Sequence, residues 1–82
     1  MNQDEQSIVD LTVMAEPIDL VKAIKLDPEI SGGGEAKILI TEGQVQLNGV
    51  TETRKRKKVF HGDIIAYCGR QIRVIVAGKS GE

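Results

Sequence analysis

A tight turn at Asn48-Gly49 constrains the fold of this 82-residue chain more than any other feature of its sequence. Asn and Gly tolerate the left-handed backbone that a two-residue hairpin turn requires. Polar and apolar residues alternate just before the turn, over positions 44–47, as they do in a half-buried strand. We therefore predict a hairpin whose first strand covers residues 44–47 and whose second strand covers residues 50–54.

Three further segments have the β-branched, alternating composition of strands. They are residues 8–13, 64–67 and 71–76. Turn-forming residues at 61–63 and 68–70 precede the last two of these segments. Together with the hairpin, they predict a small, mostly antiparallel sheet of three to five strands.

Two segments carry apolar residues at helical spacing. The first helix is expected to begin at Pro17, which suits the first helical position, and to end near Leu26, because Pro28 pushes the preceding residue out of the α region. The second helix is expected over residues 35–42, with Gly43 placed to end it. Its predicted core-facing residues are Ala36, Leu39 and Ile40. The order of the elements predicts an α+β domain in which two short helices pack on the sheet.

The length of the chain is enough for one small domain, with a free energy of unfolding of about 4 to 12 kcal/mol. We expect this domain to cover residues 7–77, between a disordered segment at 1–6 and a mobile tail at 78–82. The first six residues are polar and acidic, unlike a secretory signal, and no apolar run approaches the length of a membrane span. A cytoplasmic location is therefore expected.

Residues that could carry catalysis or hold a metal ion are sparse. His61 is the only histidine, and no serine lies in a nucleophile-elbow sequence. His61, Asp63 and Cys68 lie on neighbouring turns, but tight metal sites need three or four convergent ligands. Cys68 is the only cysteine, so we expect a partly buried, small apolar side chain rather than a disulfide. We expect no enzymatic activity, no metal and no cofactor.

The positive charges are concentrated in one run of five consecutive residues, at positions 54–58. Up to Ala36 the chain has two basic and eight acidic residues, a charge of −6; from Lys37 onward it has nine and four, a charge of +5. This asymmetry predicts a polyanionic partner for the second half, with nucleic acid first among the candidates. One Phe, one Tyr and no Trp are a poor supply of stacking platforms, so phosphate and shape recognition should dominate.

The geometry of the basic run decides which of its side chains could contact one ligand. In an extended strand, Arg54, Arg56 and Lys58 share one face, and Lys55 and Lys57 share the other. Arg54, Arg56 and Lys58 are therefore the favoured ligand contacts, unless the strand twists or opens into a loop. A charged edge strand that blocks aggregation is the alternative. Contact with RNA is favoured because five charges exceed what edge protection needs, and arginine suits bidentate contact with phosphate.

The second half of the chain has motifs in a recognisable order. Ala36 is followed by two residues, Leu-Ile, two residues and Gly43, then by an alternating strand, Asn-Gly, the basic run and Gly62-Asp63. This order resembles the RNA-binding domain first recognised in the fourth protein of the small ribosomal subunit, also called the alpha-L motif. The short, stand-alone YbcJ-like proteins of bacteria are the most similar form, and the resemblance covers about residues 17–76.

The resemblance implies a non-catalytic domain that binds structured RNA, with ribosomal or transfer RNA as the target class and the ribosome as a candidate partner. It also implies that Lys37 contacts RNA from the exposed side of the second helix. Many family members carry a Ser-Arg pair where this chain has Gly32-Gly33, so an arginine contact is not expected here. The glycines could instead offer backbone N–H groups to a phosphate, or simply let the chain turn.

The predicted RNA-binding residues form two groups, one at the second helix and one in the basic run. They are Gly32, Gly33, Gly34, Lys37, Arg54, Lys55, Arg56, Lys57 and Lys58. The sequence leaves open whether Lys22, Lys25, Arg70 and Arg73 extend this surface. We expect a monomer. The rival hypothesis is a protein-interaction module whose basic strand docks an acidic partner. Contact of the basic run with a membrane is a weaker hypothesis than either of these, because no lipidation signal or apolar anchor accompanies the charges.

Overall fold

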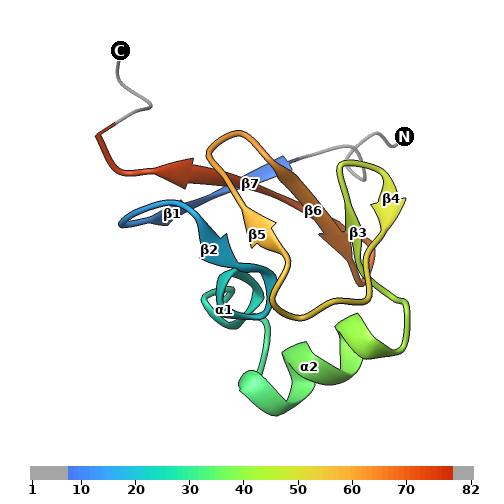
Figure 1. Cartoon of the computed structure of the whole chain (residues 1–82). Coiled ribbons are helices and arrows are strands. Elements are labelled where there is room, and N and C mark those ends of the chain that lie inside the picture. Colours follow the sequence, from blue (N-terminus) through green and yellow to red (C-terminus); the bar gives the residue numbers. More distant parts are fainter. Residues whose placement is uncertain (1–7, 79–82) are drawn as a thin grey trace, which may run out of the picture.

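The first and last strands of the domain lie side by side (Figure 1). In the computed structural model, which describes residues 8–78, β1 (Ile8–Val13) pairs in parallel with β7 (Arg70–Val76). β7 pairs antiparallel with β6 (Ile64–Tyr67), which pairs antiparallel with β3 (Gln46–Leu47). β3 forms the predicted hairpin with β4 (Val50–Thr51). The five-stranded sheet therefore has the order β1-β7-β6-β3-β4, with one parallel pair, and the predicted mostly antiparallel sheet is confirmed.

The Asn48-Gly49 turn has the predicted backbone, with φ angles of 53° and 86°. Cys68 lies in a similar turn between β6 and β7, where its φ is 53° and that of Gly69 is 74°. The thiol is exposed, so the prediction of a partly buried cysteine is wrong. The reason is local: a two-residue turn projects from the end of its strands, away from the core.

The first helix begins later than predicted. α1 spans Leu20–Lys25, and the two residues before it form β2 (Ile18–Asp19), which pairs antiparallel with β5 (Lys58–Val59). The prediction that Pro17 starts the helix is therefore wrong, because pairing with a distant strand outweighs the local preference of proline for the first helical position. The C-terminal end is close to the prediction: α1 ends at Lys25, with Leu26 as its cap.

The second helix, α2 (Gly33–Thr41), begins two residues before the predicted start. Gly32 is its N-terminal cap, with a φ of 154°, so the glycines form the first turn of the helix rather than a connector. Glu35 closes this turn, since its carboxylate accepts hydrogen bonds from the backbone N–H (2.8 Å) and hydroxyl (2.9 Å) of Ser31. Gly43 follows the last turn with a φ of 78°, as predicted.

Both helices lie on the same side of the five-stranded sheet and enclose the core with it (Figure 1). The predicted stripe of α2 is buried, and α1 and every strand except β2 and β4 contribute at least one buried apolar residue. The core residues are Val13, Leu20, Ala23, Ile24, Ile30, Ala36, Leu39, Ile40, Val45, Leu47, Val59, Ile65, Tyr67, Ile72, Val74 and Val76. The prediction of an α+β domain with two short helices on a sheet is confirmed. Neither helix within residues 8–78 is long and apolar enough to cross a membrane.

One carboxylate is buried with this core. Asp27 is 1% exposed and accepts hydrogen bonds from the Tyr67 hydroxyl (2.6 Å), the Arg70 guanidinium (3.2 Å) and the backbone N–H of Glu29 (3.0 Å). Burial, together with the hydrogen bond to this carboxylate, raises the pKa of Tyr67 far above its ordinary value, so the hydroxyl stays a donor. Asp27 therefore ties the segment after α1 to the β6–β7 hairpin.

The predicted disordered segment at 1–6 and residues 79–82 of the predicted tail lie outside the described residues. Gly78, the first residue of that predicted tail, lies in a turn after β7.

Candidate nucleic-acid interface

The first four residues of the basic run lie in a loop rather than a strand, and Lys58 begins β5. β4 ends at Thr51, and residues 52–57 cross from the five-stranded sheet to β5, so the predicted strand over 50–54 is too long. The backbone N–H of Lys57 donates to the carbonyl of Arg54 (3.1 Å), which closes a turn. The alternation of faces predicted for a strand is therefore wrong, and the alternative of an edge strand fails for the same reason. We call residues 54–58 the cationic loop.

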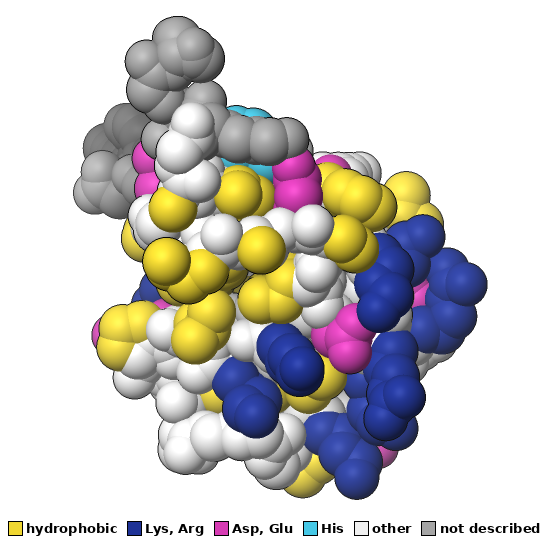
Figure 2. Space-filling model, turned by 60° about the vertical axis from the view of Figure 1, so that its left-hand side comes forward, with side chains coloured by type: hydrophobic (Ala, Val, Ile, Leu, Met, Phe, Trp, Pro, Cys, Tyr) yellow, Lys and Arg dark blue, Asp and Glu magenta, His cyan; other side chains and the backbone are white. Residues whose placement is uncertain are grey.

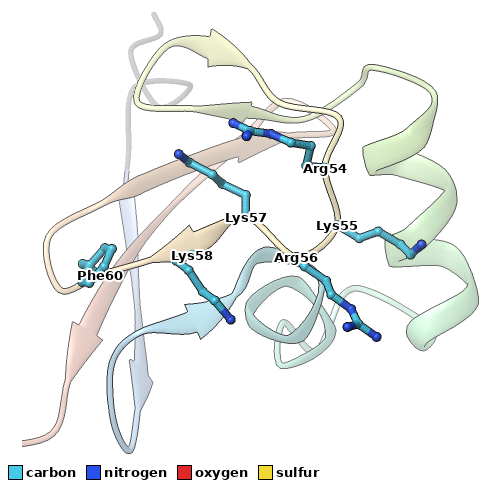
Figure 3. Close-up of a pocket in the computed structure, with 6 residues that line it drawn as sticks. All are labelled: Arg54, Lys55, Arg56, Lys57, Lys58 and Phe60. Atoms are coloured by element: carbon cyan, nitrogen blue, oxygen red, sulfur yellow. The ribbon is translucent and has the colours of Figure 1, made fainter.

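All five cationic side chains line one open pocket, together with one aromatic ring (Figure 3). The lining residues are Arg54, Lys55, Arg56, Lys57, Lys58 and Phe60. Figure 2 shows Lys and Arg side chains gathered along one side of the molecule. The structure thus brings the five predicted cations of the run together on one surface.

The first turn of α1 holds the cationic loop in place. The backbone N–H of Leu20 donates to the carbonyl of Lys57 (2.8 Å), and the N–H of Val21 donates to the carbonyl of Lys55 (3.0 Å). These groups stand at a helix start, where the N–H groups have no partner within the helix. Val59 follows the loop and is fully buried. These contacts with α1 therefore hold the loop through its backbone rather than through its side chains.

Arg54 is held by a carboxylate of its own loop. Its Nε lies 2.9 Å from Oε2 of Glu52 and its Nη2 lies 3.2 Å from Oε1, while its backbone N–H also donates to Oε2 (3.0 Å). The hydrogen bonds from the Arg54 side chain and backbone lower the pKa of Glu52 to about 2. Arg54 is therefore paired with a carboxylate of the protein itself.

We expect Glu52 to titrate well below its ordinary value of 4.5, with a midpoint near pH 2. The folded-state pKa is depressed, so the ion pair stabilises the fold above pH 4.5, and this contribution is lost as the pH falls toward 2. The midpoint can be measured by NMR of the side-chain carboxyl carbon. Arg54→Gln should return it toward 4.5. A midpoint near 4.5 in the unaltered protein would show that the pair does not form.

Lys58 is also paired. Its Nζ lies 2.7 Å from Oδ1 of Asp19, and this hydrogen bond is the largest cause of the lowered pKa of Asp19. Within residues 8–78, no ion pair involves Lys55, Arg56 or Lys57. Strand geometry favoured Arg54, Arg56 and Lys58, but in the structure it is the three middle residues of the loop that form no ion pair.

The remaining charges show that the two halves of the chain neutralise each other in part. Asp27 pairs with Arg70 (3.2 Å) and Asp10 with Arg73 (3.0 Å), so acids of the first half meet cations of the second. Arg70 and Arg73 are therefore engaged on β7 and do not line the pocket of the cationic loop. Lys22 is exposed and lines an adjacent groove that shares Lys58 with the loop.

The predicted residues at the start of α2 do not line the pocket of the cationic loop. Lys37 is exposed and lies one helical turn beyond Gly33. A β-carbon at position 33 would lie 3.3 Å from the side chain of Lys25. Gly34 borders open space. The carboxylate of Glu35 already lies at this helix end, and its negative charge works against a phosphate on the glycine N–H groups. Contact of RNA with Gly32, Gly33, Gly34 and Lys37 stays a prediction.

Sequence reasoning missed Phe60, which lines the pocket and is 48% exposed. Its spacing in the sequence could have revealed it, because Phe60 lies two positions after Lys58 and the residue between them, Val59, is buried. Within residues 8–78, no cluster of three or more His, Cys, Asp or Glu could hold a metal ion. His61 instead accepts a hydrogen bond at Nδ1 from the backbone N–H of Val76 (3.0 Å), and Asp63 binds the side chain of Asn48 (3.1 Å).

Comparison with known proteins places this arrangement in a family. The S4 domain family matches residues 11–75. This chain belongs to the S4 domain family. The "Putative RNA-binding protein YbcJ" of Escherichia coli (strain K12) is 38% identical to this S4 domain over 58 residues, which cover 71% of this chain and 83% of YbcJ. The "Uncharacterized protein YbcJ" of Shigella flexneri has the same identity and coverage.

A solved structure supports the same assignment. The solution structure of YbcJ from E. coli, described as revealing an alpha-L motif involved in RNA binding, matches this S4 domain with a TM-score of 0.66 and 31% sequence identity. The match covers 93% of this chain and 98% of that chain. The resemblance predicted from the order of motifs in the sequence is therefore confirmed.

Proposed function

We propose that this S4 domain is a monomer that binds structured RNA, without catalysis, and that the cationic loop supplies the main contacts with phosphate. Ribosomal or transfer RNA is the proposed target class. YbcJ of Escherichia coli supports the general activity, because it carries RNA binding in its name and its solved structure was described as having a motif involved in RNA binding. The observation that carries the proposal is that Lys55, Arg56 and Lys57 line one pocket and form no ion pair within the described residues.

The physical argument rests on charge and on preorganisation. Cations that already have carboxylate partners must give them up to bind phosphate, whereas the three middle residues of the loop need not. Their backbone is already fixed by α1, so binding orders only the side chains and loses less conformational entropy. Contact with phosphates then releases counterions from the RNA, which supplies most of the affinity.

The salt dependence of binding tests the proposal. Neutralising about five phosphates gives a slope of log affinity against log salt near −3.5 to −4.5, and neutralising about three gives about −2 to −3. In a filter-binding titration with transfer RNA we expect a slope between about −2 and −4.5. Lys55→Gln should make the slope shallower by about 0.7 to 0.9, because one phosphate contact is lost.

Arg73→Gln is the matched control, since it removes one cation that lies on β7 and is paired with Asp10. The slope should then stay unchanged. A flat salt response of the unaltered protein would overturn the proposal. Binding of polyglutamate as tight as that of RNA would favour the rival function, in which the loop docks an acidic protein.

A further inference from the structure

One aromatic residue stands among the cations of the loop. Phe60 is 48% exposed and shares its pocket with all five cationic side chains (Figure 3). Tyr67, the other aromatic residue of the chain, is 3% exposed and hydrogen-bonded to Asp27. Of the two, Phe60 is therefore the ring that an external ligand can reach.

The ring is presented by a fixed backbone. The N–H of Phe60 donates to Oδ2 of Asp63 (2.8 Å), and its carbonyl accepts from the N–H of Asp63 (3.0 Å). Val59 just before it is fully buried, so Lys58 and Phe60 point to the opposite, outer face. Figure 3 shows the ring at one end of the pocket, with Lys58 as the next labelled side chain.

An exposed ring beside cations matches the chemistry of a nucleotide. Bases that are unpaired offer a π face to an aromatic side chain, and their phosphates bind neighbouring Lys or Arg. A base within a duplex is stacked on both faces and cannot reach the ring. Charge also favours this ligand over an apolar peptide, because every other residue that lines the pocket is cationic.

We propose that Phe60 is a stacking platform for one unpaired nucleobase, and that the RNA bound by this domain carries a bulged or looped nucleotide beside the phosphates held by the cationic loop. This inference rests on the proposed function and adds selectivity to it. Phosphate contacts position the RNA, and Phe60 distinguishes an RNA with an extruded base from a fully paired one.

Two hairpin RNAs of equal length test the proposal, one with a single bulged 2-aminopurine and one with the same base paired. We expect the protein to bind the bulged hairpin about 5- to 100-fold more tightly, and to quench its fluorescence as the base stacks. Phe60→Leu should remove this preference and the quenching, whereas Phe60→Tyr should keep both. The salt slope should be the same for all three proteins, because Phe60 neutralises no phosphate.

The variants separate the two proposals. Because Phe60 is half exposed, both substitutions should leave the circular dichroism spectrum unchanged. If Phe60→Leu keeps the full preference for the bulged hairpin, the stacking role is wrong, while a steep salt slope would leave RNA binding by the loop intact. If the unaltered protein binds neither hairpin in a salt-dependent way, the proposed function fails, and the stacking role fails with it.

Discussion

Replacing Asp27 with alanine is expected to lower the free energy of unfolding by about 3 kcal/mol, a large part of the roughly 4 to 12 kcal/mol that hold a domain of this size. The Tyr67 hydroxyl loses its acceptor in the core, and Arg70 loses the partner of its charge. Breaking a buried ion pair by removing one member costs about 3 to 5 kcal/mol. We expect a cost at the lower end of this range, because 30% of the Arg70 side chain is exposed and water can hydrate its charge.

Urea denaturation followed by circular dichroism measures this loss. Tyr67→Phe removes one of the three hydrogen bonds to Asp27, so it should cost less, about 1 to 3 kcal/mol. Glu29→Gln is the control, because Glu29 is 69% exposed and its contact with Arg70 is long, at 3.9 Å. Its effect should be within about 1 kcal/mol of zero. If Asp27→Ala were no more harmful than this control, the buried network would have no structural role.

The double substitution Arg56→Glu with Lys57→Glu is expected to weaken RNA binding by at least about 100-fold. Two contacts with phosphate are lost, each worth about 1.5 to 3 kcal/mol as a hydrogen bond to a charged group, and repulsion is added. The fold should persist, because Lys57 supports α1 through its backbone carbonyl, which glutamate retains. Binding of transfer RNA in vitro and RNA crosslinking in cells are the measurements.

Arg54→Glu is the informative comparison. This arginine is already held by Glu52, so its replacement should reduce binding less than reversal at Arg56 alone. Equal losses at the two positions would mean that RNA displaces Glu52 and that all five cations act together. Crosslinking that survives the Arg56 and Lys57 reversal would show that another surface binds RNA.

Local signals in the sequence predicted the parts of the fold that depend on a few adjacent residues. The stripe of α2, its end at Gly43 and the Asn48-Gly49 turn are of this kind, because helix periodicity and backbone preference act over one or two turns. The start of α1 was mispredicted, since Ile18 pairs with Val59, far along the chain. No window around Pro17 contains that information.

The same limit applies to the candidate site. Composition and motif order identified the basic run, and the run does form one surface. How much each basic residue contributes to ligand binding could not be predicted, because it depends on where Asp19 and Glu52 lie after folding. Strand geometry favoured Lys58, which is paired 39 positions away in the sequence, and gave lower weight to Lys55, which has no ion pair within the described residues.

The parallel pairing of β1 with β7 has a consequence for how a new copy of this domain is made. Asp10 and Arg73, which form an ion pair across these strands, are 63 positions apart. A ribosome releases β1 early, but the partner of β1 is the last of the described strands to emerge. Contacts between segments so distant form slowly, because a long loop must close first. We therefore expect the sheet to be completed only after β7 has left the ribosome, with the β7-facing edge of β1 open until then to pairing with other nascent chains.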